Sequence, residues 1–307
     1  MHEAPRGVWA TMLTPFREDG AIDYNGLERL IEWYIEHRVA GLFAVCKSSE
    51  SAHMTRDERV SVARFVVKHT RGRVPVIAGG NLSDTLPEQA REMQTLAEAG
   101  VDAVVVLSSK VVDQGANDRQ WRASMERLLK LVPEDTQLGV YESPSPYHRI
   151  VGRESLAWCR ETGRFRFLKD TSCSATAISE KLETVRGSSL RVFNAHTQTL
   201  LHSLRLGAAG YSSVMANVNP SLYDWLIRNY AAEPDRAERL QWFLSVADAA
   251  TVARCYPASA KYFLTLEGVP FSLFTRTSTR FPVDDTMKRT MDQLWRLNQE
   301  YLNAYGC

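Results

Sequence analysis

The segment Arg164-Phe165-Arg166-Phe167-Leu168-Lys169-Asp170-Thr171-Ser172 alternates in polarity and carries a lysine where the alternation ends. A period of two is typical of a β-strand and predicts that Phe165, Phe167 and Lys169 lie on one face. If that face lines a barrel, Lys169 lies at the C-terminal mouth, where such barrels hold their active sites. Lys169 is then either a nucleophile that forms a Schiff base with a keto acid or a lysine that extends from a strand end to solvent.

Short β-like runs and amphipathic helical runs alternate over the first two-thirds of the chain. The β-like runs are residues 7–13, 41–45, 74–78, 102–107, 137–141, a run that ends at Lys169, 190–193 and 209–214. Eight such units over about 220 residues predict an α/β fold, a (β/α)8 TIM barrel. An open, doubly wound sheet is the competing arrangement, because the number of strands does not show that a sheet closes.

Local signals mark the ends of several helices. Thr55-Arg56-Asp57-Glu58 has the pattern of a capping box, and Gly100 is typical of the residue that follows a helix. Asn219-Pro220 predicts a further helix start. No later segment has a convincing strand pattern, and residues 287–302 carry an apolar stripe at helical spacing. We therefore predict a barrel over residues 1–220 and a C-terminal domain of about three helices over residues 221–307.

The composition narrows the class of protein. The chain has 307 residues with 37 basic and 36 acidic side chains, so no basic excess indicates a nucleic-acid partner. No apolar run is long enough to span a membrane, and the N-terminus has no secretory signal pattern. The five cysteines form neither a metal-binding pattern nor a redox pair. These features predict a cytoplasmic protein with free thiols and no metal site.

Two other strand ends carry side chains that suit chemistry. The run 137–141 ends on Tyr141, whose phenol could relay a proton at a barrel mouth, although a strand tyrosine is more often part of a core. The run 41–45 continues into Cys46-Lys47-Ser48-Ser49-Glu50-Ser51. Its hydroxyls and backbone amides could bind a carboxylate, and an ordinary serine-rich turn is the alternative.

Three weaker candidates also follow strand ends. Glu142 is expected either to line the pocket or to pair with a cation. His196, which follows the run 190–193, could face a substrate, whereas a helix-capping or surface position is the alternative. Ser212 is placed where the last strand would approach an imine at Lys169.

Taken together, these pieces resemble the dihydrodipicolinate synthase and N-acetylneuraminate lyase family of class I aldolases. The resemblance spans essentially the whole chain, and its specificity comes from the order and spacing of the motifs. The motifs are Ala10-Thr11-Met12-Leu13-Thr14-Pro15-Phe16, Ser48-Ser49-Glu50, Tyr141 with Pro144, Lys169-Asp170-Thr171-Ser172 and Gly207-Ala208-Ala209-Gly210-Tyr211-Ser212-Ser213.

The resemblance implies specific roles for these residues. Lys169 would be the Schiff-base lysine, Tyr141 the proton relay, and Ser48 and Ser49 part of the site for the keto-acid carboxylate. The family also implies a closed barrel with C-terminal helices, usually a homotetramer, and no metal or organic cofactor.

This sequence departs from the family pattern at three places. Lys47 stands where the family loop has its first hydroxyl residue, and Pro146 stands where an arginine often follows the tyrosine motif. Leu107-Ser108-Ser109-Lys110 replaces a segment in which synthases carry an aromatic residue for a neighbouring subunit. We therefore doubt a function in lysine biosynthesis. Lys47 is predicted either to lower the pKa of Lys169 or to bind a second anionic group of the substrate, with a lysine turned to solvent as the alternative.

The sequence thus predicts a cytoplasmic Schiff-base aldolase or lyase that cleaves or forms a carbon–carbon bond of a 2-keto-3-deoxy acid, with pyruvate as one product or substrate. The alternatives are a Schiff-base dehydratase of a keto-deoxy sugar acid, a dihydrodipicolinate synthase, and a non-catalytic keto-acid-binding protein.

Overall fold

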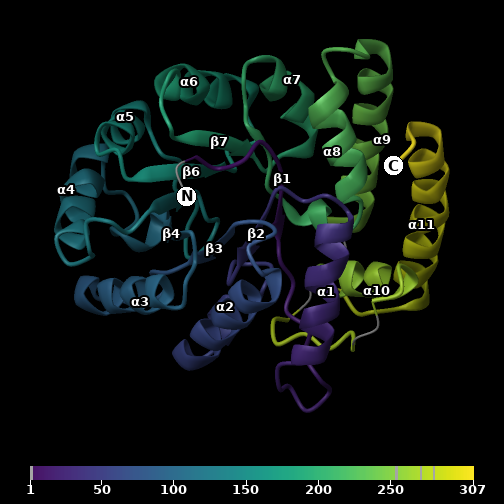
Figure 1. Cartoon of the computed structure of the whole chain (residues 1–307), viewed down its shortest axis with the longest axis horizontal. Helices are drawn as coiled ribbons and strands as arrows, with labels where there is room; N and C mark the ends of the chain where they lie inside the picture. The colour runs from purple at the N-terminus through teal and green to yellow at the C-terminus, as the bar shows by residue number, and fades with distance from the viewer. Residues whose placement is uncertain (1–2, 253–254, 270–271, 279–280) are drawn as a thin grey trace.

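A computed structural model describes residues 3–252, 255–269, 272–278 and 281–307. Eight parallel strands form a closed barrel in sequential order, which confirms the predicted fold and excludes the open sheet (Figure 1). The strands are Gly7–Thr11 (β1), Gly41–Ala44 (β2), Val76–Gly79 (β3), Ala103–Leu107 (β4), Leu138–Tyr141 (β5), Phe165–Asp170 (β6), Arg191–Asn194 (β7) and Gly210–Tyr211 (β8).

A helix follows each strand and covers the outside of the barrel (Figure 1). These helices are Tyr24–Glu36 (α1), Arg56–Thr70 (α2), Leu86–Glu98 (α3), Asp118–Leu129 (α4), Arg153–Glu161 (α5), Ala175–Val185 (α6), Leu200–Arg205 (α7) and Pro220–Asn229 (α8). The capping box before α2 is present, with Thr55 and Glu58 each bonding the backbone of the other. Gly100 follows α3 with a φ of +93°, as predicted for a C-terminal glycine.

The barrel closes where β8 pairs with β1, and two glycines allow the close approach. Gly210 is in register with Gly7. A Cβ atom on Gly210 would lie 1.9 Å from the Gly7 carbonyl oxygen, and Gly210 has a φ of +157°. Only glycine fits both the space and the backbone conformation at this position.

Two layers of apolar side chains hold the fold together. A larger cluster fills the space between the strands and the helices. A smaller cluster fills the barrel interior and is rich in aromatic rings, with Trp9 packed on Phe167 and Phe167 stacked on Phe193 at centroid distances of 5.1 and 4.6 Å. This interior cluster fills the barrel below its C-terminal mouth.

Four helices follow β8 in the described residues, of which one completes the barrel and three are appended to it, in agreement with the predicted number of about three. Helix α8 begins at Pro220 as predicted and packs against β1, so it takes the place of the eighth barrel helix. Asn219 precedes α8, but its side chain makes no cap hydrogen bond. The remaining helices lie beside α8 on one side of the barrel (Figure 1) and are Pro234–Val252 (α9), Ala258–Leu266 (α10) and Asp285–Tyr305 (α11). The division of the chain at residue 220 remains a prediction.

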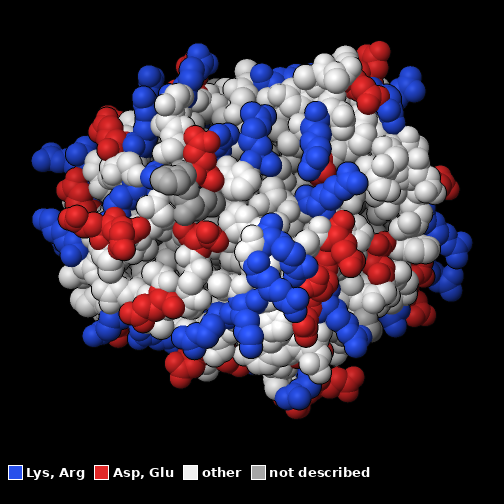
Figure 2. Space-filling view, in the orientation of Figure 1, with Lys and Arg blue, Asp and Glu red and all other residues white. Residues whose placement is uncertain are grey.

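The surface carries both signs of charge. In Figure 2, basic side chains gather near the lower centre of the visible face and acidic side chains flank them. This mixture agrees with the formal net charge of +1. Among the described residues, no helix is long and apolar enough to cross a membrane.

Candidate functional site

Lys169 lies near the end of β6 and lines a cavity of about 990 Å³. Its backbone is in register with Tyr141 of β5 and Phe193 of β7. Its Nζ atom lies 4.6 Å from the centre of the Tyr141 ring and 5.8 Å from that of Phe43. Only 5% of the Lys169 surface is exposed, so the amine is enclosed by aromatic rings and does not extend to solvent.

The prediction that Phe165 shares this face is wrong. Phe167 belongs to the interior cluster, whereas Phe165 belongs to the outer cluster and lies 6.1 Å from Trp158 of α5 between ring centres. The register between β5 and β6 shifts at this point, because Leu138 pairs with Phe165 while the next residue, Gly139, pairs with Phe167. An extra residue of this kind reverses the side-chain alternation.

The Lys169 amine is partly deprotonated at neutral pH. Burial lowers its pKa from 10.5 to about 8, the nearby Cys46 thiol opposes this change, and the Lys47 ammonium adds to it. No carboxylate in the described ranges forms an ion pair with Lys169. A pKa of about 8 leaves about a tenth of the amine neutral at pH 7, against about one part in a few thousand for a free lysine.

This pKa predicts how the rate of imine formation depends on pH. We expect the rate with subsaturating pyruvate to rise nearly tenfold per pH unit between about pH 6 and 7, and to level off above about pH 8, because only the neutral amine attacks a ketone. Pyruvate is mixed with the protein at each pH, and samples are quenched with borohydride at one common pH after increasing times. A rate that keeps rising toward pH 10 would contradict the lowered pKa.

Tyr141 presents its phenol to the same cavity. Burial raises the pKa of this phenol well above its ordinary value, the Cys46 thiol raises it further, and a hydrogen bond with Ser143 opposes both. The hydroxyl is therefore protonated at neutral pH. Tyr141 can donate this proton to a substrate oxygen or carbon and recover it in a later step.

The loop after β2 is shaped for an anion. Val45 and Glu50 bracket it with φ angles of +48° and +60°, a conformation rare for a β-branched valine. The backbone N–H groups of Lys47 and Ser48 have no acceptor among the described residues. Ser48 lines the cavity and its hydroxyl donates to Thr11 Oγ1 at 3.3 Å. Strain held at a ligand-facing loop is common in functional sites.

Lys47 reaches across the barrel mouth rather than turning outward. Its Nζ atom donates to Ser145 Oγ at 3.1 Å, and Ser145 lies in the loop after β5. Both residues line the cavity. Burial of the stem lowers the pKa of this ammonium.

Four of the predicted site residues lie outside the cavity lining. Ser49 holds the loop in shape, since its hydroxyl donates to the Met12 carbonyl oxygen at 2.7 Å and accepts from the Cys46 N–H. Ser212 is fully buried after β8, and its hydroxyl has no hydrogen-bond partner among the described residues. His196 contacts Thr199 through Nδ1 at 3.2 Å, and its neighbour Ala195 lines the cavity instead. The fourth is Glu142, which faces away from the barrel interior.

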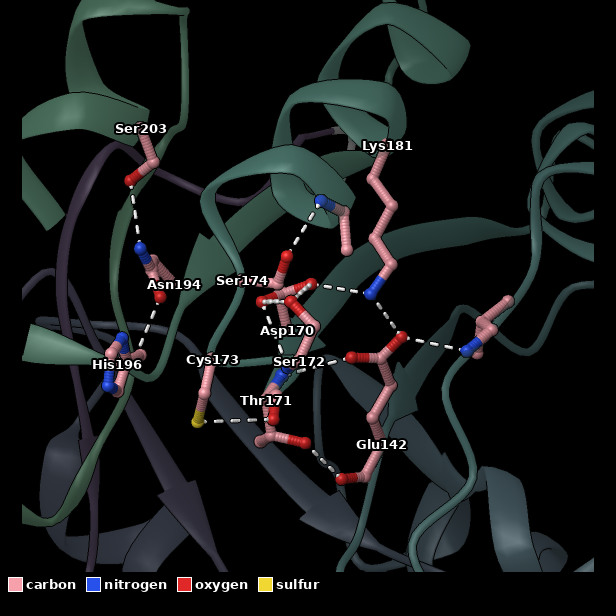
Figure 3. Close-up of polar contacts among 12 residues, drawn as sticks. Glu142, Asp170, Thr171, Ser172, Cys173, Ser174, Lys181, Asn194, His196 and Ser203 are labelled. Carbon is pink, nitrogen blue, oxygen red and sulfur yellow. Dashed lines mark hydrogen bonds and ion pairs between the residues drawn. The ribbon is translucent and has the colours of Figure 1, made fainter. Parts of the chain in front are cut away.

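Glu142 pairs with a cation, which was one of its two predicted roles. Lys181 of α6 donates to Glu142 and to Asp170, and Figure 3 shows the two carboxylates converging on it from β6 and the end of β5. Glu142 also accepts from the Thr171 N–H at 2.9 Å. Burial raises the pKa of Glu142, Lys181 opposes this, and Asp170 adds to it. The network fixes the backbone that follows Lys169 to the residue that follows β5.

Ionisable residues that the sequence did not indicate also line the cavity, among them Tyr256 and Asp248. Tyr256 is hydrogen-bonded to Ser48, and Asp248 lies on α9. Lys261 of α10 does not line the cavity but forms a buried ion pair with Glu50 at 3.0 Å. These contacts show that the C-terminal helices help to shape the loop after β2. No local pattern could have indicated them, because they join segments about 200 residues apart.

A (β/α)8 barrel with an enclosed lysine at its C-terminal mouth defines a class of protein that can form a Schiff base with a carbonyl compound. Comparison with known proteins then shows the family. The model of the dihydrodipicolinate synthetase family matches residues 4–109 and 160–297, and the chain belongs to this family. It is an enzyme of that family, a lyase.

Individual relatives support the same assignment. The chain is 31% identical to a 4-hydroxy-tetrahydrodipicolinate synthase of Psychrobacter arcticus over 218 residues, which are 70% of this chain and 69% of the relative. A dihydrodipicolinate synthase of Bacillus anthracis has the same fold, with a TM-score of 0.86 at 20% identity over 95% of this chain and 97% of the other. A dihydrodipicolinate synthase of Acinetobacter baumannii, solved in complex with pyruvate, has a TM-score of 0.85 at 19% identity over 96% and 99%.

The family match leaves out one segment of the barrel. Residues 110–159 are not matched, and they include Tyr141 and the departure at Pro146. Lys169 and the loop after β2 lie inside the matched ranges. The part of the mouth formed by β5 and the loop that follows it therefore lies outside the family match.

Proposed function

We propose that this enzyme is a class I lyase that cleaves or forms a carbon–carbon bond of a 2-keto-3-deoxy acid through an imine on Lys169, with pyruvate as the smaller partner. One observation about Lys169 supports the proposal. Lys169 is enclosed in the cavity, has no carboxylate partner in the described residues, and has a pKa of about 8. An amine in this state is a competent nucleophile.

In the cleavage direction, the neutral Lys169 amine attacks C2 of the keto acid, and loss of water gives a protonated imine. The imine withdraws the electron pair of the C3–C4 bond as that bond breaks. Tyr141 relays the proton that leaves the C4 hydroxyl, so that an aldehyde departs. Protonation of the remaining enamine at C3 and attack of water on C2 then release pyruvate and restore the amine.

The carboxylate of the keto acid is proposed to bind at the loop after β2. The free N–H groups of Lys47 and Ser48 and the Ser48 hydroxyl supply the donors that a carboxylate prefers. Ser49 supports this site by holding the loop and does not touch the ligand.

Trapping the imine tests the proposal. The protein is incubated with pyruvate, reduced with borohydride, digested and mapped by mass spectrometry. We expect one modified peptide, with the reduced pyruvyl group on Lys169. Failure of pyruvate and of a panel of longer 2-keto acids to label Lys169 would overturn the proposal and favour a non-catalytic protein. Pyruvate release from 2-keto-3-deoxy acids then separates a lyase from a dehydratase, which would retain all carbon atoms.

Replacement of the phenol separates imine formation from turnover. We expect Tyr141→Phe to keep measurable labelling of Lys169 while losing about 10²–10⁴-fold in kcat, because the ring that encloses the amine remains and the relay of the proton is lost. Labelling and pyruvate release are measured on the same preparation. Turnover at the unmodified rate in this variant would remove the role assigned to Tyr141.

We also propose that the enzyme works in the cytoplasm and as a homo-oligomer. The thiols of Cys46, Cys159, Cys173 and Cys307 are free, which suits a reducing compartment. Trp242 and Val246 of α9 are 64% and 71% exposed, which suits a subunit contact. Sedimentation velocity at several protein concentrations tests the second statement.

A further inference from the structure

The cavity extends beyond Lys169, and three of the charged residues that line it are already neutralised by ion pairs. Its volume of about 990 Å³ is at the upper end of the range for ligand pockets and far exceeds what a three-carbon keto acid fills. The paired residues are Arg59 with Glu92, Lys110 with Asp84, and Glu50 with Lys261.

Lys47, like Lys169, has no such ion pair in the part of the chain that the structure describes. No carboxylate in the described part of the chain lies within ion-pair distance of its ammonium. Its one hydrogen bond is the 3.1 Å contact with Ser145 Oγ. An ammonium has three N–H donors, so two remain for a ligand. Asp248, a second acidic residue of the lining beside Glu50, lies on α9, where it accepts from Gln198 at 3.4 Å and forms no ion pair with Lys47.

Lys47 and its neighbour Ser48 serve different parts of the cavity. The Ser48 side chain contacts Thr11 of β1 and Tyr256 of the C-terminal segment. The Lys47 side chain extends the other way, to the loop after β5. When the first carboxylate of a ligand is bound at Ser48, the Lys47 ammonium is therefore still available to a second group of the same ligand, farther along the cavity.

We propose that Lys47 binds a second anionic group, a carboxylate or a phosphate, at the end of the substrate remote from the imine. This inference rests on the proposed function, and it defines the substrate class as 2-keto acids that carry two anionic groups. The contact is charge-assisted, and such hydrogen bonds are stronger than those between neutral groups.

Imine trapping with matched keto acids tests this subsite without knowledge of the natural aldehyde. The pairs are 2-oxopentanoate with 2-oxoglutarate and 2-oxohexanoate with 2-oxoadipate, in which only the end group changes. The measured quantity is the concentration that gives half-maximal borohydride labelling of Lys169. We expect at least one dicarboxylate to need about tenfold less than its apolar partner. Including 2-oxo-4-phosphonobutanoate shows whether carboxylate or phosphate is preferred.

Variants then locate the preference. Lys47→Met should abolish the difference within each pair, and Lys47→Arg should retain most of it. Lys110→Met is the matched control, because it removes a lysine from the same cavity whose charge Asp84 already neutralises; it should retain the difference. Equal half-maximal concentrations within both pairs, or a preference that survives Lys47→Met, would overturn this inference while labelling by pyruvate still supports the proposed function. Absence of labelling by any keto acid would overturn both.

Discussion

Lys169→Met is expected to abolish imine formation and, at the same time, to make the protein more stable at pH 7. The wild-type fold holds an ammonium in an enclosed, aromatic site, and no described carboxylate forms an ion pair with it. A pKa of about 8 instead of 10.5 corresponds to a cost of about 3 kcal/mol for burying the charged form. Methionine fills similar space without a charge, so this cost disappears. Activity should fall more than about a thousandfold, since the covalent step is lost.

The gain in stability should depend on pH with a defined sign. The folded-state pKa is lower than that of the unfolded chain, so the cost is fully present below about pH 8 and fades as the pH rises to about 10.5. The difference in the free energy of unfolding between Lys169→Met and wild type is measured by urea denaturation at pH 7 and pH 10. Lys68→Met removes an exposed lysine of α2 and is the control, with no expected difference between the two pH values. An equal difference at both pH values for Lys169→Met would show that the native site does not disfavour the ammonium.

The sequence was sufficient for the barrel and for the contact between Lys169 and Tyr141. Each strand end is encoded locally, and in a closed parallel barrel the C-terminal ends of all strands meet at one mouth. The prediction from period-two alternation failed only at Phe165, where the register shift between β5 and β6 reverses the direction in which the side chain points. A bulge of this kind depends on the pairing of two strands, and one strand alone does not indicate it.

Contacts between distant segments could not be predicted. The partner of Glu142 was expected to be a cation, yet nothing in the sequence singled out Lys181 among 37 basic residues. Tyr256 and Lys261 lie in the C-terminal region, where the apolar pattern predicts helices but not which polar side chains turn toward the barrel. The direction of Lys47 was also open, because a long side chain at a loop can extend to solvent or across the mouth.

Lys181→Met is expected to cost about 3–5 kcal/mol of stability at pH 7, the largest loss that we predict for a single replacement. Lys181 is the cation between two carboxylates that are 0% and 1% exposed, and its removal leaves Glu142 and Asp170 facing each other without compensation. The Glu142 pKa, already raised by burial, should then rise further because Lys181 is one of the groups that hold it down. Since a carboxyl with a raised pKa retains its proton in the folded state, the loss should be smaller at pH 5 than at pH 7.

A double variant distinguishes an unpaired charge from lost packing. Glu142→Gln removes one of the two carboxylate charges while keeping an oxygen that can accept from the Thr171 N–H. We expect the double variant with Lys181→Met and Glu142→Gln to be more stable than Lys181→Met alone. The interaction free energy between the two replacements should be well above the deviation from additivity that is seen for distant sites. The free energies of unfolding are measured by urea denaturation, with Lys68→Met as the exposed control. If the double variant is less stable than Lys181→Met, then lost packing of the lysine stem, rather than repulsion between the uncompensated carboxylates, accounts for the effect. Because Asp170 follows Lys169 on β6 and Glu142 follows Tyr141 at the end of β5, the same variants should also slow borohydride labelling of Lys169 by pyruvate in proportion to the loss of order at the two strand ends.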